Sequence, residues 1–347
     1  MDRTSEIPAP SATRPLADNQ STKTRPAGGI RVGMIVGPTG AGKTAFAIEL
    51  AERLGAEIVN ADSRQLYRGM DLGTAKPTAA ERSRVPHHLI DVRAPDAPLD
   101  VAEFATMADA VIAEIAARGR PVLIVGGSGL YLRVLRGGIF TGPAASREYR
   151  AELGALAAAR GAPYLHRRLA AVDAVAALRI GVEDLPRIMR ALEVHALSGI
   201  PISEHQRRHR EGGAGGGHEN LAIGLAVARE RLYTRIDRRF ERMVAGGLIE
   251  EVRGLLAAGY GAGSVALQAI GYREIAQYLS GELTLAAAIE AAQRESRRLA
   301  KRQMTWFRRE PGLVWLDPDT GSAEALRLFR EFFRLPVAAA TEIEGLA

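Results

Sequence analysis

The sequence predicts an α/β protein with a parallel sheet, helices on both faces of the sheet, and a helical insertion domain. Short apolar runs alternate with amphipathic segments over residues 30–136, which is typical of parallel strands joined by crossover helices. The alternation stops over residues 137–206, where the spacing is helical throughout, and then resumes. A glycine-rich loop between the first apolar run and the first helical segment matches a phosphate-binding motif.

The individual elements follow from their own hydrophobic patterns. We expect strands at the short apolar runs 31–36, 56–60, 88–92, 121–125, 221–227 and 313–316. Helical spacing, often closed by a glycine, occurs at 43–54, 101–118, 147–160, 184–198, 229–245, 247–258 and 284–309.

These patterns divide the chain into a tail, a discontinuous core and an insertion. Residues 1–29 are rich in Pro, Ser, Thr and Ala without hydrophobic periodicity, which is typical of a disordered tail. We expect the core to comprise residues 30–136 and 207–320, interrupted by the helical insertion at 137–206. Residues 321–347 are expected to form a C-terminal helix or tail.

The composition excludes several classes of protein. The 347 residues include no Cys, which excludes a disulfide framework, a thiolate zinc site, an iron–sulfur cluster and a cysteine nucleophile. No apolar run approaches the ~18 residues needed to span a bilayer. The tail also lacks the apolar core of a secretory signal. We therefore expect a cytoplasmic protein that does not bind membranes.

The most specific motif is G-x-x-x-x-G-K-[ST] after a predicted strand and before a predicted helix. Its residues are Gly37, Pro38, Thr39, Gly40, Ala41, Gly42, Lys43 and Thr44. The glycines let backbone N–H groups surround a phosphate, and the helix N-terminus adds a favourable dipole. Lys43 supplies a positive charge, and Thr44 can bind Mg²⁺. The motif predicts a phosphate site in a P-loop NTPase-like core.

Several usual companions of this loop in an ATP or GTP enzyme are missing. The fourth predicted strand ends in Gly126 and Gly127, where an aspartate usually holds Mg²⁺. Asp62 follows the second strand, at the sheet edge where ligands of open α/β sheets bind. We interpret it as a base or a metal partner, and the alternative is a helix N-cap. A P-loop kinase of a small metabolite or nucleotide, or a non-catalytic RNA-binding ATPase, uses the same loop.

Six blocks together resemble the bacterial tRNA dimethylallyltransferases, also called tRNA isopentenyltransferases. They are residues 37–44, 62–77, 86–91, 126–131, 268–273 and 300–307, in the order of that family. The resemblance covers residues 31–317 and implies transfer of a dimethylallyl group from dimethylallyl diphosphate, with Mg²⁺. The acceptor in that family is N6 of the adenosine immediately 3′ of the anticodon, at tRNA position 37.

The resemblance also implies roles for individual residues. The phosphate loop would hold the diphosphate of the donor, and Arg239 corresponds to a diphosphate-binding arginine. Asp62 would be the general base on N6. Ser128 stands in a catalytic block where the family usually has Thr, and it keeps the hydroxyl.

The implied macromolecular partner is the anticodon stem-loop of tRNA, and DNA is not expected. Ser63, Arg64 and Gln65 would join Asp62 and Ser128 near the extruded adenosine. Other positions that match tRNA-contacting segments are Arg150, Pro186, Arg187, Ile188, Met189, Arg190, Gln268, Ala269, Ile270, Gly271, Tyr272 and Arg273. We expect a monomer, because no pattern suggests a dimer seam. We also expect the donor to enter through a channel from the side opposite the RNA.

The positive charge of the chain is concentrated near residue 300. The whole chain has 46 Lys and Arg against 40 Asp and Glu, a net charge of +6, and the stretch 294–309 has the same net charge. Arg294, Arg298, Lys301 and Arg308 recur at helical spacing. Such a stripe favours an RNA phosphate backbone, so Arg298 and Lys301 are further candidate tRNA contacts.

Two aromatic pairs allow both functional and structural interpretations. His88 begins a predicted strand and His87 directly precedes it. Neighbouring side chains in a strand face opposite ways, so we expect structural roles instead of one shared site. Trp306 and Phe307 either stack on bases or belong to the core.

Overall fold

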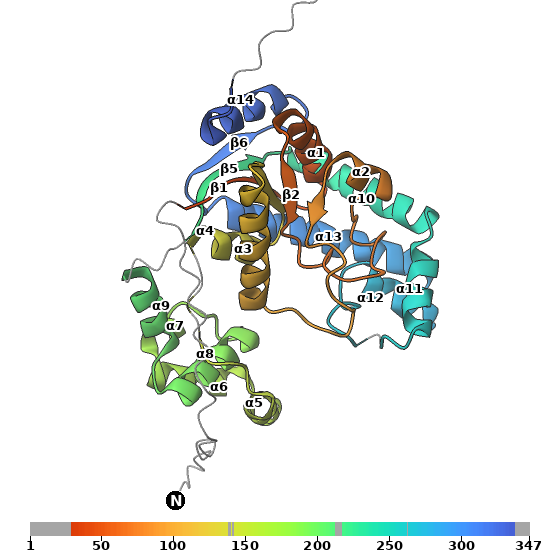
Figure 1. Ribbon diagram of the computed structural model, residues 1–347. Helices are drawn as coiled ribbons and strands as arrows, with labels where there is room; N and C mark the ends of the chain where they lie inside the picture. The colour runs from red at the N-terminus through yellow and green to blue at the C-terminus, as the bar shows by residue number, and fades with distance from the viewer. Residues whose placement is uncertain (1–28, 138–139, 141, 212–216, 262, 337–347) are drawn as a thin grey trace, which may run out of the picture. The chain divides into compact units, whose positions relative to one another are not determined.

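The structure is a computed structural model that describes residues 29–137, 140, 142–211, 217–261 and 263–336 (Figure 1). Most of the predicted N-terminal tail therefore lies outside the described residues. The chain forms two compact units. We call residues 27–137 and 217–347 the core unit, and residues 138–216 the helical unit.

The helical unit interrupts the core unit where the sequence predicts an insertion. It begins one residue after the predicted start at 137. Its last helix, α9 (Ile202–Glu211), continues across residue 206, where the sequence analysis places the end of the insertion.

The core unit is built on a six-stranded sheet with the strand order β3-β2-β4-β1-β5-β6. Every neighbouring pair is parallel, as predicted from the alternation of strands and helices. Its strands are β1 (Arg31–Val36), β2 (Glu57–Asn60), β3 (His87–His88), β4 (Val122–Gly126), β5 (Glu219–Leu225) and β6 (Leu313–Leu316). Because β1 pairs with both β4 and β5, the sheet joins segments from before and after the insertion.

The third strand is much shorter than the predicted strand 88–92. It contains only His87 and His88, because Leu89 and Asp91 have φ values of 58° and 59°. A left-handed backbone cannot continue a β-ladder. The chain turns away instead, and the Asp91 carboxylate accepts a hydrogen bond from Lys76 Nζ at 2.5 Å.

Helices cover both faces of the sheet, as predicted. Figure 1 shows α1 (Lys43–Leu54) and α14 (Ser322–Phe333) together on one side, where they share a buried cluster with the strands. The other face packs against α3 (Val101–Ala117), α4 (Gly129–Gly137) and Phe307. Phe307 is therefore a core residue, one of the two roles that the sequence left open.

A third apolar cluster of the core unit lies beyond the carboxyl ends of the strands. It joins α10 (Arg229–Ala245), α11 (Leu248–Ala257), α12 (Tyr272–Leu279) and α13 (Leu285–Phe307) with Tyr67 and Met70. The short helix α2 (Ala79–Arg84) starts with a capping box between Thr78 and Glu81. The loop that follows β2 is thus anchored by the helices and does not depend on the sheet alone.

The helical unit has its own core. Besides α9 it contains α5 (Arg147–Arg160), α6 (Ala162–Val172), α7 (Ala174–Ala177) and α8 (Leu185–Ser198). Fully buried side chains from three of these helices, including Leu153, Leu165 and Val194, form its cluster. None of the described helices in either unit is long and apolar enough to cross a membrane.

Candidate active site

The phosphate loop has the conformation that its glycines predict. Gly40 and Gly42 have φ values of 82° and 89°, and a Cβ on Gly40 would lie 2.8 Å from Cγ1 of Ile236. Gly42 is the N-cap of α1 and has no side chain that could accept from the first turn. The first N–H groups of α1 therefore remain available to a phosphate.

Two segments far away in the sequence hold the loop from outside. Arg239 of α10 donates to Oγ1 of Thr39 at 2.6 Å. Oε1 of Gln303, from α13, accepts from the backbone N–H of Thr39 at 2.8 Å, while its Nε2 donates to the carbonyl of Gly127 at 2.9 Å. The loop is therefore fixed relative to both the α10–α13 cluster and the end of β4.

Two cationic side chains meet at this loop. Burial lowers the pKa of Lys43 to about 8; the Asp62 carboxylate opposes this shift and the nearby Arg239 adds to it. Burial also lowers the pKa of Arg239. In this structure the Lys43 ammonium donates to the carbonyl of Pro38 at 2.9 Å. Both charges would be stabilised by an anion bound in the loop.

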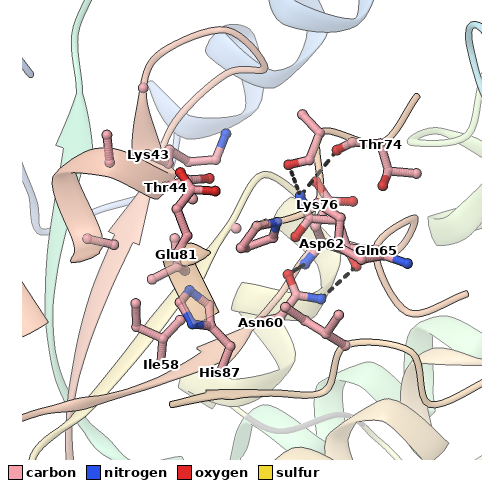
Figure 2. A pocket seen from close by; sticks show the side chains of 18 of the residues that line it. Lys43, Thr44, Ile58, Asn60, Asp62, Gln65, Thr74, Lys76, Glu81 and His87 are labelled. Atoms are coloured by element: carbon pink, nitrogen blue, oxygen red, sulfur yellow. Dashed lines mark hydrogen bonds between the residues drawn. The ribbon is translucent and has the colours of Figure 1, made fainter. Parts of the chain in front are cut away.

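Asp62 lies directly after β2, at the edge where the sequence places it. Its Oδ1 accepts from the backbone N–H of Arg64 at 2.9 Å, and its own backbone N–H donates to Oδ1 of Asn60 at 3.1 Å. No helix begins among residues 61–70, so the alternative interpretation of Asp62 as a helix N-cap is wrong. Figure 2 shows Asp62 across the pocket from Lys43 and Thr44.

Ser128 connects the loop after β2 to the end of β4. Its Oγ accepts from the backbone N–H of Ser63 at 3.0 Å and lies 3.3 Å from the hydroxyl of Ser63. Arg64 donates to the carbonyl of Val265 at 2.9 Å. Gln65 donates to two carbonyls of its own loop, at 3.1 and 3.2 Å. These contacts hold the loop that carries Asp62 in one position.

Two pockets of the core unit meet at the residues described above. Pocket A has a volume of about 520 Å³ and is lined by residues that include Thr44, Asn60, Lys76, His87 and Arg242 (Figure 2). Pocket B has a volume of about 630 Å³ and is lined by residues that include Ser63, Arg64, Ser128, Ile270, Arg302 and Trp306. Both share the lining residues Thr39, Lys43, Asp62, Thr74 and Arg239.

The missing acid at the end of β4 has a steric explanation. A Cβ on Gly126 would lie 2.2 Å from the carbonyl oxygen of Ala61, and a Cβ on Gly127 would lie 2.6 Å from Nε2 of Gln303. Position 126 cannot carry an aspartate while the loop after β2 keeps its place, whereas at position 127 only the end of the Gln303 side chain would have to move. An aspartate in place of Gly126, the last residue of β4, is therefore incompatible with this site.

The donor set at the loop fits a magnesium ion that also binds a phosphate ligand. The Thr44 hydroxyl and the Asp62 carboxylate line the same pocket. The described residues contain no group of three or more His, Asp or Glu side chains that could hold a metal by themselves. Mg²⁺ usually binds through one or two protein oxygens together with substrate phosphates and water.

Comparison with known proteins identifies the family. The model of the IPP transferase family matches residues 65–310, more than half of the chain. The chain belongs to the IPP transferase family. It is 50% identical over 287 residues to the tRNA dimethylallyltransferase of Geobacter metallireducens, covering 83% of this chain and 92% of that protein. The corresponding enzyme of Anaeromyxobacter dehalogenans is 50% identical over 291 residues, with 83% and 95% coverage.

Solved structures agree with this assignment. The full-length tRNA isopentenylpyrophosphate transferase of Bacillus halodurans is 39% identical, with a TM-score of 0.65 and coverage of 88% of this chain and 97% of that one. A eukaryotic dimethylallyltransferase solved while acting on tRNA is 24% identical, with a TM-score of 0.76 and coverage of 90% and 81%. The second similarity shows that this chain and the eukaryotic protein have the same fold.

The segment 268–273 of this IPP transferase is divided between pocket B and the core. Gln268, Ala269, Ile270 and Arg273 line pocket B. Gly271 and Tyr272 do not line it. Both are buried, and the Tyr272 hydroxyl donates to Glu251. The Tyr272 side chain therefore supports the pocket from behind, and it presents no surface to RNA in this structure.

In the helical unit, two predicted arginines converge on one buried carboxylate. Both Nε and Nη2 of Arg150 donate to Glu193 at 2.9 Å, and Nη1 of Arg190 donates to it at 2.6 Å. The Glu193 side chain is 0% exposed, whereas those of Arg150 and Arg190 are 46% and 33% exposed. Glu193 therefore positions both guanidinium groups at the surface of the unit.

The other predicted positions of α8 differ in exposure. Pro186 and Arg187 are exposed, and Arg187 pairs with Asp184 at 2.8 Å. Met189 is half-buried, and Ile188 is fully buried in the core of the helical unit. The Ile188 side chain is thus a packing residue and cannot touch RNA.

The basic stripe on α13 is partly neutralised by the fold. Arg298 pairs with Glu295 at 2.6 Å, and Arg297 pairs with Asp237 of α10 at 2.5 Å. Lys301 is exposed, and no carboxylate among the described residues lies within 4.0 Å of it. Arg302, from the same helix, lines pocket B. The stripe thus extends to pocket B, but fewer of its side chains are without an ion-pair partner than the sequence suggests.

The structure also shows site residues that the sequence analysis gave no role. Asn60 holds the backbone of Asp62, and Gln303 holds the phosphate loop. Gln303 lies in the block 300–307, so the family resemblance includes this residue, but it does not show that Gln303 binds Thr39. Lys76 donates to the carbonyl of Tyr67 at 2.8 Å and to the carboxylates of Asp71 and Asp91 at 2.5 Å.

The two histidines have separate partners, as expected. Nδ1 of His87 donates to the carbonyl of Val85 at 2.7 Å, and Nε2 of His88 contacts Glu57 at 2.7 Å. Trp306 lines pocket B, and the Arg133 guanidinium lies 4.2 Å from the centre of its ring. The stacking alternative for Trp306 therefore remains compatible with its place.

Anion binding should depend on the protonation of Lys43. We expect the affinity for inorganic diphosphate, with Mg²⁺ present, to fall as the pH rises through about 8. Above that pH the free enzyme has lost the proton that the bound state retains, so binding must take up a proton. Isothermal titration calorimetry from about pH 6.5 to about 9.5 would measure this dependence on both sides of the Lys43 pKa.

The matched control is Lys43→Arg, which stays charged over this range. The ratio of wild-type to variant affinity removes the titration of diphosphate itself, and it should decrease above about pH 8. Parallel pH profiles for the two proteins would contradict the prediction.

Proposed function

We propose that this chain transfers a dimethylallyl group from dimethylallyl diphosphate to N6 of the adenosine immediately 3′ of the anticodon in tRNA. One observation carries the proposal: Lys43, Arg239 and Asp62 lie together in the wall that pockets A and B share. An anion-binding group and a candidate base thus face a common space that is open to two different substrates. The identity of 50% to a protein named tRNA dimethylallyltransferase supports the same activity.

The phosphate loop and Arg239 would bind the diphosphate of the donor. Their positive groups lie where negative charge develops as the C1–O bond of the allylic donor breaks. Arg239 is suited to this role because its planar group contacts phosphate through two nitrogens. No phosphoryl group is transferred, which agrees with the absence of an acid at the end of β4.

Asp62 would act on the acceptor. The lone pair of an exocyclic adenine amine is delocalised into the ring, so the amine is a weak nucleophile. As the N6–C1 bond forms, N6 loses a proton to the Asp62 carboxylate, and the diphosphate leaves with the electron pair of the C1–O bond. Such general-base assistance is typically worth ~10²–10⁴-fold in rate.

Magnesium fits this scheme as a partner of the leaving group. The Thr44 hydroxyl would help to hold Mg²⁺, and the ion would supply positive charge for the leaving group. The residues of the chain bind and orient the donor, and Asp62 takes the proton.

The two pockets suggest separate routes for the two substrates. Pocket B, lined by Ser63, Arg64, Gln268 and Arg302, would receive the adenosine after it leaves the stacked anticodon loop. Pocket A would then admit the donor from the other side, consistent with the channel that we expect. The helical unit would contribute Arg150 and Arg190, which Glu193 holds at its surface, to the RNA backbone.

The decisive experiment is group transfer itself. Incubation of the protein with radiolabelled dimethylallyl diphosphate, Mg²⁺ and unmodified tRNA should move the label into tRNA. Release of labelled γ-phosphate from ATP to a small acceptor would instead support the kinase alternative. Folded protein that leaves tRNA unlabelled would refute the proposal.

Replacement of Asp62 tests the proton-transfer role. Asp62→Asn keeps the side-chain shape and the contact with the Arg64 N–H but removes the basic carboxylate. We expect kcat to fall by ~10²–10⁴-fold, with the tRNA dissociation constant nearly unchanged. Asp96→Asn, in an exposed loop position, is the control. Near-wild-type kcat in Asp62→Asn would mean that another group is the base.

The α13 stripe should act on tRNA affinity and not on chemistry. The double variant Arg298→Gln/Lys301→Gln should raise the KM for tRNA. The slope of the logarithm of tRNA affinity against the logarithm of salt concentration should become shallower by about 1 to 2, since each phosphate contact contributes ~0.7–0.9. Lys301 should contribute more, because Glu295 already neutralises part of Arg298. The control is Arg327→Gln on α14, which pairs with Glu324 at the same i,i+3 spacing. An unchanged salt slope would show that the stripe does not contact RNA.

A further inference from the structure

Helix α10 carries six arginines, and two of them differ from the others in their surroundings. The Arg229 guanidinium lies 5.3 Å from the centre of the Tyr233 ring. Arg231 and Arg235 both pair with Asp319, and Arg239 donates to the phosphate loop. Arg238 and Arg242 are exposed, and within the described residues no carboxylate lies within 4.0 Å of either.

This arrangement has a cost for the helix. Arg238 and Arg242 are four residues apart on one face of α10, where two like charges destabilise a helix. Nε of Arg242 donates to the backbone carbonyl of Arg238 at 3.4 Å, which holds the Arg242 side chain against the preceding turn of the helix. Glu241, between them, instead accepts from Gln293 of α13. Neither arginine is therefore ion-paired among the described residues, and the hollow that they share with Arg235 and Glu241 has more positive than negative side chains.

The position of the pair connects it to pocket A. Arg235, Arg238, Glu241, Arg242 and Ala245 line a surface hollow of about 610 Å³. Arg242 also lines pocket A, together with Lys43 and Thr44 of the phosphate loop. A basic surface thus continues from the outside of α10 into the pocket that contains the anion site.

We infer that Arg238 and Arg242 form a charged entrance that attracts the diphosphate of the donor into pocket A. The inference rests on the proposed function. A cleft lined by one sign of charge raises the local concentration of an oppositely charged ligand and its association rate. The donor would enter through pocket A, because the adenosine and its RNA would fill pocket B.

An RNA backbone is the competing ligand for two exposed arginines. The observations favour the small diphosphate, because Arg242 lines pocket A, Arg238 lines the adjoining hollow, and neither lines pocket B. The cationic residues that line pocket B from α12 and α13 are Arg273 and Arg302. Besides Lys43 and Arg239, which line both pockets, the donor side and the RNA side thus have basic residues of their own on different helices.

The test measures kcat/KM for dimethylallyl diphosphate at saturating tRNA in the wild type and in Arg238→Gln. For a trianion passing about 10 Å from the removed charge, the value should drop about four-fold near 10 mM ionic strength and about two-fold near 150 mM. The kcat at saturating donor should not change, because Arg238 does not line pocket A. Glu241→Gln removes a negative charge from the same hollow and should raise kcat/KM.

The control is Arg253→Gln on α11, an exposed arginine that pairs with Glu250 and lies outside all three hollows. The inference is overturned if Arg238→Gln matches Arg253→Gln, or if the KM for tRNA and its salt slope change instead of the donor kcat/KM. The second outcome would assign the pair to RNA.

Stopped-flow measurement of the association rate of inorganic diphosphate with Mg²⁺ separates this inference from the proposed function. It requires no group transfer. A wild-type protein that leaves tRNA unlabelled would refute the proposed function, while a slower association in Arg238→Gln would still support the charged entrance. An active wild type with equal association rates in both proteins would refute the entrance alone.

Discussion

The site depends on the way in which Thr39, in the middle of the phosphate loop, is held. Its hydroxyl accepts from Arg239 of α10, and its backbone N–H donates to Gln303 of α13. Gln303 also reaches the carbonyl of Gly127 at the end of β4. Gln303 thus joins the sheet to the helical cluster. The wall that the two pockets share forms at this junction. Without these contacts the loop could still bind phosphate at the edge of the sheet, but it would have no fixed position relative to pocket B, which would receive the acceptor.

The close approach of the chain around the loop also determines its chemistry. Because Gly126 touches the backbone of Ala61, the end of β4 cannot carry an acid. The carboxylate of the site comes instead from Asp62, in the loop after the neighbouring strand β2, and Asn60 and Ser128 position this loop. Two cations and one carboxylate then share a partly dehydrated space. This balance suits the departure of an anion coupled to proton acceptance better than phosphoryl transfer.

Much of the fold could be predicted because it follows from local patterns. The period of the apolar residues located all six strands, and all but β3 end within two residues of their predicted limits. The β3 prediction failed because Leu89 is apolar but left-handed, and two residues later Asp91 bonds to Lys76 instead of continuing the strand. Tertiary packing also explains why Ile188 and Tyr272 are buried, although both were predicted to contact tRNA. Motif matching places them in RNA-contacting segments, but burial depends on which side of the helix meets its neighbours.

The sequence by itself determined the phosphate loop, the parallel α/β core, the insertion and the position of Asp62 at a strand end. These depend on short-range spacing and on the conformational freedom of glycine, which a few consecutive residues specify. Only the tertiary structure decided that Gln303 and Arg239 meet Thr39, that Arg242 lines pocket A, and that Glu193 holds two arginines. Such contacts join residues up to 264 positions apart, and they arise from the packing of α10 and α13 beyond the strand ends. Local periodicity contains no information about that packing.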